Sequence, residues 1–143
     1  MKLIVCLDDR DGILFFGRRL SSDRVVISEI AEIVGSAPLR IHPYSRELFS
    51  DQSFNLHVDD GFLKQAGKND WFFLEQGEIP IDPAEVEILY VFRWNRHYPS
   101  DVKFDLSPFQ GRLTKTDFYE LTGYSHPVIG VEVYTKCGQR SRN

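Results

Sequence analysis

Short apolar runs that end at polar or glycine residues recur along the chain and predict the order of its elements. The run Leu3–Leu7 is apolar throughout and stops at Asp8, a pattern typical of a strand buried on both faces. Apolar residues then recur at helical spacing over 26–34, with Ser22 as the expected N-cap and Gly35 as the expected end. By the same reasoning we expect strands at 39–44, 71–74, 86–92, 111–114 and 129–134, and a short helix at 59–66.

Strands that alternate with helical segments predict an α/β fold with a single mixed, mostly parallel sheet flanked by short helices. The last two predicted strands follow each other without a helix between them, which predicts an antiparallel C-terminal edge. No linker or internal repeat interrupts the chain. We therefore expect residues 1–137 to form one domain and residues 138–143 to form a polar tail.

Composition and charge narrow the class of protein. The chain has 143 residues, of which 42% are hydrophobic and 27% charged, which is typical of a globular protein and excludes a disordered chain. The net charge of −4 and the scattered Lys and Arg residues argue against a nucleic-acid partner. No apolar stretch reaches the ~18 residues of a membrane span, and the N-terminus lacks the pattern of a signal peptide. We therefore expect a cytoplasmic protein that does not bind a membrane.

A series of short motifs occurs in a characteristic order. The motifs are Trp71-Phe-Phe-Leu-Glu-Gln-Gly-Glu-Ile, Val86-Glu-Ile-Leu-Tyr-Val-Phe-Arg, Tyr98-Pro-Ser-Asp-Val-Lys-Phe-Asp-Leu, Asp117-Phe-Tyr, Tyr124-Ser-His-Pro and Val131-Glu-Val-Tyr. This order resembles the C-terminal part of dihydrofolate reductase, and residues 3–12 are similar to the first strand of that family. The resemblance implies a dihydrofolate reductase-like scaffold. A reductase of this type protonates a pterin ring while NADPH delivers hydride.

The chain departs from this family at the positions that would hold cofactor and substrate. The family has a Gly-Gly pair that lets the backbone approach the cofactor pyrophosphate, and the matching residues here are Glu75 and Gln76. Phe92 matches the family's substrate-binding Thr, and the family's Pro-Trp element is missing. The interval from Gly35 to Trp71 is also shorter, as if one strand–helix unit were lost. We therefore expect no bound cofactor, with NADPH as the cofactor if a reductase activity is retained.

Asp23 is the residue that the resemblance matches to the catalytic carboxylate of the family. A general acid in this role needs a pKa that burial has raised. The alternative is an exposed Asp in the first turn of a helix, where the helix dipole favours a negative charge.

Basic and aromatic residues form two candidate binding groups. Arg18 and Arg19 precede a helix start and could hold a phosphate or carboxylate, or lie solvated in a loop. The densest polar-aromatic stretch, of a kind that often anchors an interface, contains Arg93, Trp94, Arg96 and Tyr98. The alternative for this stretch is that Trp94 packs on the core while the arginines extend to solvent.

The sequence predicts neither a metal site nor a catalytic triad. The four histidines are isolated, and neither cysteine belongs to a C-x-x-C pair. Asp8, Asp9 and Asp11 could hold a hard cation, but they lack the spacing of a calcium loop, so we expect a solvated turn. A Ser-His-Asp arrangement is not expected because the chain has no G-x-S-x-G motif.

Three functional hypotheses follow from these observations. The leading one is a small cytoplasmic, non-catalytic protein that binds a protein or small-molecule partner on a degenerate dihydrofolate reductase-like scaffold. The second is an NADPH-dependent reductase of a pterin-like or other small heterocyclic substrate. The third is a nucleotide- or anion-binding domain that uses Arg18 and Arg19. Exposed strands could in addition pair two copies in a homodimer.

Overall fold

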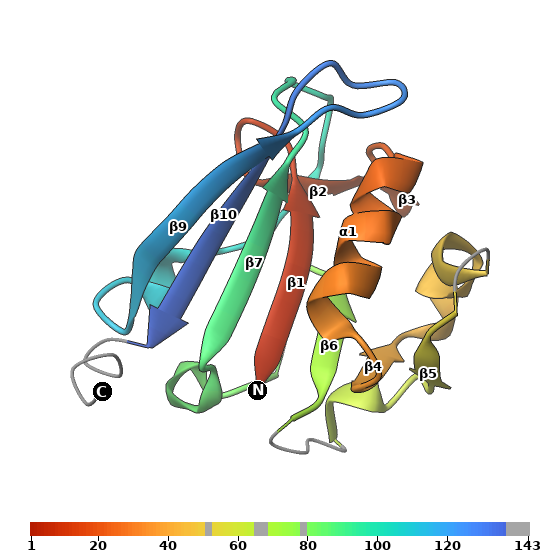
Figure 1. Ribbon diagram of the computed structural model, residues 1–143. Helices are drawn as coiled ribbons and strands as arrows, with labels where there is room; N and C mark the ends of the chain where they lie inside the picture. Colours follow the sequence, from red (N-terminus) through yellow and green to blue (C-terminus); the bar gives the residue numbers. More distant parts are fainter. Residues whose placement is uncertain (51–52, 65–68, 78–79, 137–143) are drawn as a thin grey trace.

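The structure is a computed structural model that describes residues 1–50, 53–64, 69–77 and 80–136 (Figure 1). The strands are β1 (Lys2–Leu7), β2 (Gly12–Phe15), β3 (Arg18–Arg19), β4 (Pro38–Ile41), β5 (Asn55–Val58), β6 (Trp71–Leu74), β7 (Ile88–Arg93), β8 (Val102–Lys103), β9 (Leu113–Leu121) and β10 (Ile129–Lys136). Within the described ranges, the helices are α1 (Arg24–Val34) and four 3-10 helices, η1 (Pro43–Phe49), η2 (Phe62–Lys64), η3 (Pro83–Glu85) and η4 (Ser107–Phe109). Within the described residues, no helix is long and apolar enough to span a membrane.

Seven strands form the main sheet, in the order β5-β4-β6-β1-β7-β10-β9. β1 pairs in parallel with β6 and β7, and β4 pairs in parallel with β5 and β6. β10 is antiparallel to both β7 and β9. The predicted mixed, mostly parallel sheet with an antiparallel C-terminal edge is therefore confirmed. This topology brings the carboxyl ends of β1, β4, β6 and β7 to one edge of the sheet (Figure 1).

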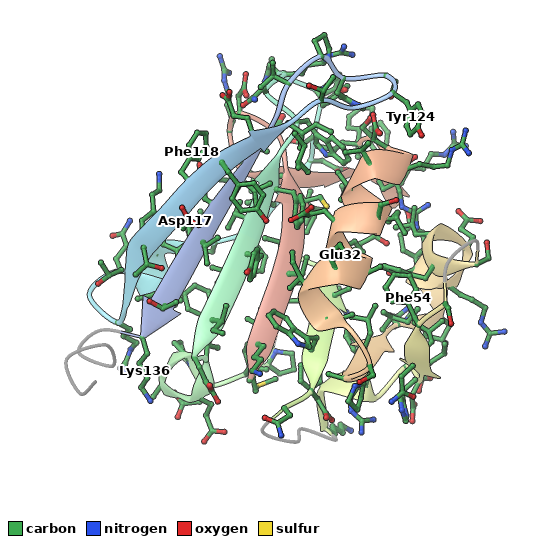
Figure 2. The ribbon with its side chains drawn as sticks, in the orientation of Figure 1. Glu32, Phe54, Asp117, Phe118, Tyr124 and Lys136 are labelled. Carbon is green, nitrogen blue, oxygen red and sulfur yellow. The ribbon has the colours of Figure 1, made fainter. Side chains whose placement is uncertain are left out.

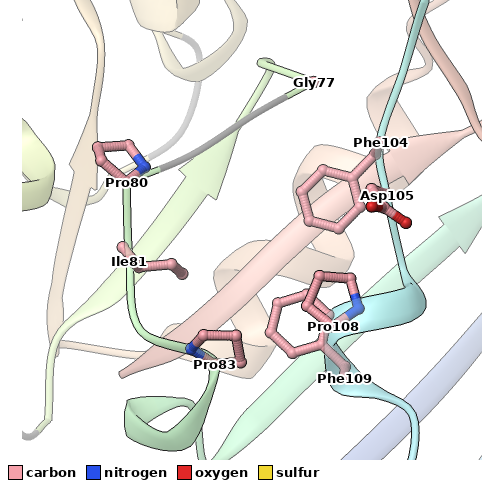
Figure 3. Close-up of a pocket in the computed structure, with 8 residues that line it drawn as sticks. All are labelled: Gly77, Pro80, Ile81, Pro83, Phe104, Asp105, Pro108 and Phe109. Carbon is pink, nitrogen blue, oxygen red and sulfur yellow. The ribbon is translucent and has the colours of Figure 1, made fainter.

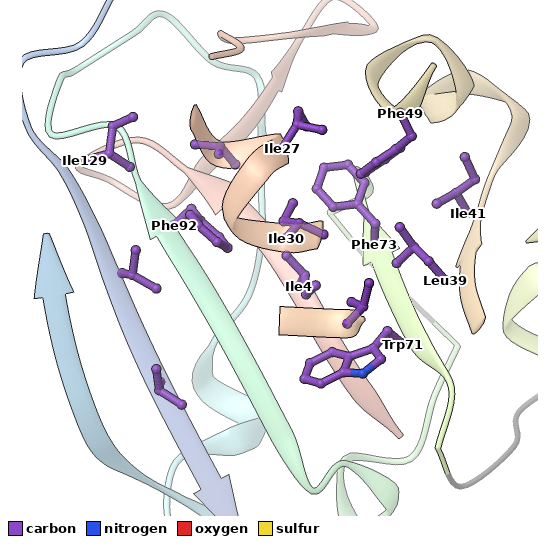
Figure 4. Close-up of a cluster of buried hydrophobic side chains, with 14 of the residues drawn as sticks. Ile4, Ile27, Ile30, Leu39, Ile41, Phe49, Trp71, Phe73, Phe92 and Ile129 are labelled. Carbon is purple, nitrogen blue, oxygen red and sulfur yellow. The ribbon is translucent and has the colours of Figure 1, made fainter. Parts of the chain in front are cut away.

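Helix α1 covers one face of this sheet (Figure 1). Its N-cap is Asp23, whose side chain accepts the N–H of Val25, and not the predicted Ser22. The helix ends at Gly35 as predicted, with a φ of 56° in the left-handed region that favours glycine. Its apolar side packs into a buried cluster (Figure 4) that includes Ile4, Ile27, Ile30, Phe73, Phe92 and Ile129.

The opposite face of the main sheet is covered by short elements. A small sheet of order β3-β2-β8 and the turn η4 contribute to a second buried cluster. Within it, the rings of Phe104 and Phe109 stack with an interplanar angle of 7°. Leu3 and Val5 belong to this second cluster, whereas Ile4 belongs to the first. The continuous apolar run of β1 is thus explained by burial on both faces.

Two predicted elements end earlier than expected. The strand predicted at 39–44 stops at Ile41, because Pro43 starts η1 and the ring of His42 accepts the N–H of Tyr44 as the cap. The helix predicted at 59–66 is only the 3-10 turn Phe62–Lys64, and residues 65–66 lie outside the described chain. The predicted polar tail, 138–143, also lies outside it.

Two strands show where the hydrophobic pattern is uninformative. β5 was not predicted, and β9 extends from Leu113 to Leu121 although only 111–114 was expected. Both strands lie at the edges of the main sheet. Most side chains of β9 are exposed, so its sequence does not alternate between apolar and polar residues. The strand predicted at 86–92 is observed at Ile88–Arg93, and the final strand is confirmed with two further residues at its end.

Candidate functional site at the carboxyl edge of the sheet

The start of α1 meets the ends of β1, β6 and β7 at the edge where ligands often bind in α/β proteins. Cys6 in β1, Glu75 after β6 and Trp94 after β7 line one cavity together with Ser21 and Asp23. The cavity has a volume of about 20 Å³. A space of this size holds roughly one water molecule. In this conformation it cannot accept an organic substrate.

Asp23 is buried at this edge, and its carboxylate is fully used by donors from the same chain. Oδ1 accepts the N–H groups of Val25 and Tyr124 at 3.0 and 3.1 Å. Oδ2 accepts the N–H and hydroxyl of Ser125 at 2.9 and 3.2 Å and lies 3.0 Å from Nδ1 of His126. Burial alone would raise the pKa of Asp23, but the bonds from His126 and the backbone outweigh it and hold the pKa well below its usual value. At neutral pH, Asp23 therefore has no proton to donate.

His126 links Asp23 to two hydroxyl groups. Its Nε2 lies 2.8 Å from Ser21 Oγ and 3.2 Å from Tyr98 Oη, and its ring packs on Trp94 with centroids 4.7 Å apart. These contacts fit a hydrogen on Nδ1 and a lone pair on Nε2. Ser21, His126 and Asp23 are thus bonded in the order of a catalytic triad, although the sequence predicted none. The cavity beside Ser21 is too small for an acyl group, so the observed role of this network is to fasten the 122–128 loop to the start of α1.

Arg19 and Glu75 form a second network at the end of β6. The guanidinium donates to both carboxylate oxygens of Glu75, from Nε at 2.8 Å and from Nη2 at 3.0 Å. Ser45 Oγ donates to Glu75 Oε1 at 2.7 Å, and Arg19 Nη1 donates to Glu47 Oε2 at 2.8 Å. The guanidinium also lies over the ring of Tyr44. We call Arg19, Glu75 and Ser45 the Glu75 lock, because together they tie β3 and η1 to the end of β6.

A recess lies beside the Glu75 lock, and we call it the Gly17 recess. Its volume is about 230 Å³, and it is lined by Leu14, Gly17, His42, Tyr44, Ser45, Glu75 and Gln76. This volume is below the ~300–1,000 Å³ that is typical of small-molecule sites. Gln76 Oε1 is buried and has no hydrogen-bond partner among the described residues. The recess beside the end of β6 is therefore smaller than a typical small-molecule site.

The arginines of the two candidate binding groups have different surroundings. Arg18 is exposed in β3, whereas its neighbour Arg19 forms ion pairs with carboxylates of the same chain. Arg93 is likewise ion-paired within the chain, because it donates to Asp11 Oδ1 at 2.6 Å and to Glu132 Oε2 at 3.3 Å.

The remaining residues of the polar-aromatic stretch hold the 122–128 loop or the core. Trp94 is buried in the first core cluster and against His126, as the alternative interpretation expected, but Arg93 does not extend to solvent as that interpretation also expected. Tyr98 contacts the same imidazole, and Arg96 donates to the carbonyl of Ser125 at 3.0 Å. The structure thus brings Trp94 and Tyr98 together with Asp23.

The acidic cluster at the end of β1 stabilises a turn. Asp8 is buried, and its carboxylate accepts the N–H groups of Arg10, Gly12 and Tyr98 at 2.7 to 3.0 Å. Asp8 is therefore not solvated, which corrects that expectation. Among the residues that the structure describes, no three His, Cys, Asp or Glu side chains group as metal ligands.

A larger pocket lies away from this edge, on the side of the second core cluster (Figure 3). Its volume is about 510 Å³, and its walls are Gly77, Pro80, Ile81, Pro83, Phe104, Asp105, Pro108 and Phe109. We call it the Phe104 pocket. Glycine, proline, isoleucine and phenylalanine make up its walls apart from Asp105, which is the one charged residue among the described residues that line it.

Some of these residues could be predicted from the sequence and others could not. Asp23 and Glu75 were candidates from the sequence, whereas their partners Ser45, Ser21 and His126 were not. His126 lies 103 residues from Asp23 in the chain, and no local motif marks the pair. The signal that could have found it is the family-like Tyr124-Ser-His-Pro segment, which precedes the last strand.

The thiol of Cys6 provides a test of how closed this edge is. Burial, reinforced by the nearby charge of Glu75, raises the pKa of Cys6 far above its usual value. In a Cys137→Ser background, we expect a disulfide reagent at pH 8 to modify native Cys6 at least ~100-fold more slowly than the urea-unfolded chain. Equal rates would show that the cavity is open to solvent.

The buried oxygen of Gln76 has no hydrogen-bond partner among the described residues, and this predicts an unusual substitution. A buried acceptor without a partner costs about 1–3 kcal/mol. We therefore expect Gln76→Met to leave the free energy of unfolding unchanged or to raise it by about 1 kcal/mol in urea titrations. A loss of more than about 1 kcal/mol would mean that the amide makes a contact that stabilises the fold.

Comparison with known proteins supports the fold and nothing finer. No protein-family model and no curated protein sequence matches the chain. Among solved structures, it is similar to dihydrofolate reductase from Enterococcus faecalis, described as complexed with NADP(H) and RAB-propyl, with a TM-score of 0.64. The match covers 95% of this chain and 96% of that chain at 11% sequence identity. The resemblance predicted from the sequence motifs is therefore confirmed at the level of the fold.

Proposed function

We propose that this protein, which has a dihydrofolate reductase-like fold, is a non-catalytic binding protein whose own side chains close its coenzyme groove. The observation that carries the proposal is the Glu75 lock. Glu75 occupies the position that the motif comparison matches to the first glycine of the family's cofactor turn. A glycine there leaves room for the pyrophosphate and exposes N–H donors to it. A carboxylate held in place by Arg19 and Ser45 instead presents bulk and negative charge.

The substrate side of the site supports the same proposal. The cavity between α1 and the ends of β1 and β6 holds about one water molecule, so a pterin-sized ring does not fit. The Asp23 carboxylate is ionised and saturated with donors, whereas a general acid must carry a proton at the working pH. The small cavity and the depressed pKa of Asp23 both support the non-catalytic proposal over the reductase hypothesis.

The anion-binding hypothesis loses one of its two arginines for a similar reason. The guanidinium of Arg19 already faces two carboxylates, Glu47 and Glu75. A phosphate would have to displace both of them or be held by Arg18 alone. We keep the cytoplasm as the proposed location, and a protein or small molecule as the proposed class of partner.

An activity assay distinguishes the proposal from the reductase alternative. The purified chain at micromolar concentration is incubated with NADPH and dihydrofolate, and NADPH oxidation is followed by its absorbance. We expect no oxidation above the rate without protein, and the same result for Asp23→Asn. Turnover that is present in the wild-type protein and lost in Asp23→Asn would establish the reductase and overturn the proposal.

A further inference from the structure

The hairpin between β2 and β3 ends in two exposed aromatic side chains. Phe16 is 76% exposed and Phe15 is 36% exposed, and their ring centroids lie 4.3 Å apart. Arg18, which is also exposed, pairs with Phe15 across the hairpin. We call residues 15–18 the Phe16 tip. Exposed aromatics next to an arginine have the composition of the central residues of protein interfaces.

The backbone of the Phe16 tip is unfavourable for a phenylalanine. φ is 49° at Phe16 and 75° at Gly17, so both central residues of this two-residue turn are left-handed. Such turns favour Asn-Gly, because a bulky side chain is strained in this region. Phe16 is 76% exposed even though its ring lies against that of Phe15, so burial within its own chain offsets little of the strain. A strained and exposed residue of this kind points to a contact outside the chain.

The rest of the hairpin holds this tip in place. The carboxylate of Asp101 accepts the N–H of Phe16 at 3.1 Å, and the N–H of Asp101 donates to the carbonyl of Leu14 at 3.1 Å. On the other strand, the N–H of Arg19 donates to Tyr44 Oη at 2.9 Å, and its side chain belongs to the Glu75 lock. The aromatic pair is therefore presented in a fixed position, which reduces the entropy lost on binding.

The same molecule carries a pocket with the complementary chemistry. Apolar side chains form most of the Phe104 pocket, and its volume of about 510 Å³ is suited to aromatic rings. Asp105 lines it, and hydrogen bonds from Ser107 lower the pKa of this carboxyl group, so it is negatively charged at neutral pH. The tip thus offers two rings and a positive charge, and the pocket offers apolar walls and a negative charge.

We propose that two copies of the chain form a symmetric dimer in which the Phe16 tip of each copy enters the Phe104 pocket of the other. The tip and the pocket are connected through the two ends of β8. The tip is anchored by Asp101 just before β8, and Phe104 and Asp105 follow directly after β8. In a two-fold dimer, a contact between the tip of one copy and the pocket of the other occurs twice. This proposal does not depend on whether the coenzyme groove is closed.

A second copy fits the observations better than a membrane surface. The chain has a net charge of −4, and Arg19 beside the tip pairs with the exposed carboxylate of Glu47. Anionic lipids would repel both the chain and this carboxylate. A tip inserted into a membrane would also leave the Phe104 pocket empty. The dimer accounts for both the exposed tip and the pocket.

The test is sedimentation equilibrium from low micromolar to near-millimolar concentration. We expect the wild-type protein to dimerise, and Phe16→Asn to weaken the dimer by ~30-fold or more in Kd. Because Phe16→Asn creates an Asn-Gly turn, its monomer is expected to be at least as stable as the wild-type monomer in urea. The matched control is Tyr124→Asn, since Tyr124 is 75% exposed but lies on the loop between β9 and β10 (Figure 2). This control should leave the dimer unchanged.

A charge exchange tests the pairing of tip and pocket. Arg18→Asp and Asp105→Arg should each weaken the dimer, and the double variant should restore most of the lost affinity. A wild-type chain that stays monomeric at every concentration would overturn the proposal. A dimer that is as sensitive to Tyr124→Asn as to Phe16→Asn, or an Arg18→Asp/Asp105→Arg variant without recovery, would overturn it as well.

Discussion

Replacing Asp23 by alanine should lower the free energy of unfolding by about 3 kcal/mol, because it removes an N-cap and leaves buried donors without an acceptor. The donors are the N–H groups of Val25, Tyr124 and Ser125 and the ring of His126. Urea titration at neutral pH measures the loss. Asp9→Ala is the matched control, since Asp9 is exposed in the turn after β1, and it should change stability by less than about 0.5 kcal/mol.

The contribution of Asp23 should also depend on pH in a defined direction. Its pKa is depressed in the folded protein, so the stabilisation is present above the unfolded value of ~3.9 and is lost as the pH falls through the folded value. The stability difference between the wild-type protein and Asp23→Asn should therefore be constant from about pH 5 to 7 and shrink below about pH 4. A difference that grows on acidification would mean that Asp23 is protonated in the folded protein.

Replacing Glu75 by alanine should cost about 2–3 kcal/mol, because Arg19 then remains largely buried without its two-pronged partner. Glu47→Ala is a matched control on the same guanidinium. The Glu75 side chain is 9% exposed and the Glu47 side chain is 76% exposed, so Glu47→Ala should cost less than about 0.5 kcal/mol. Urea titrations of the two variants give both values. Equal losses would show that the bond to Glu75 is no stronger than a surface ion pair.

The double replacement Arg19→Met with Glu75→Met should be less destabilising than Glu75→Ala alone. A buried ion pair costs desolvation of both partners, and removing both charges avoids leaving either one unpaired. If the double variant lost as much stability as the sum of the losses in Arg19→Met and Glu75→Met, the two partners would contribute independently of each other.

The buried parallel strands could be predicted from the sequence because burial on both faces leaves a continuous apolar run. Leu3–Leu7 shows this in the clearest form, and the class of the sheet followed from such runs and from their order. The edge strands β5 and β9 could not be predicted in the same way. Their side chains are mostly exposed or only half buried, so no core imposes a period on their sequence.

The candidate site could be predicted only in part. The departure at Glu75 was visible because a glycine-rich turn leaves a local motif. The partners of Glu75 come from β3 and η1, and the partner of Asp23 comes from the loop before β10. Such contacts are set by the sheet topology, which joins residues more than 25 positions apart. Asp23 illustrates the consequence, because its sequence position fitted both a general acid and an exposed residue in the first helical turn, whereas the structure shows a buried N-cap that is bonded to His126.

Isothermal titration of NADPH into the wild-type protein measures whether the coenzyme groove is closed. With Glu75, Arg19 and Ser45 filling the groove, we expect no saturable heat up to millimolar coenzyme. A one-to-one isotherm with a micromolar dissociation constant would contradict it, because the coenzyme could bind only if the side chains at the end of β6 gave way.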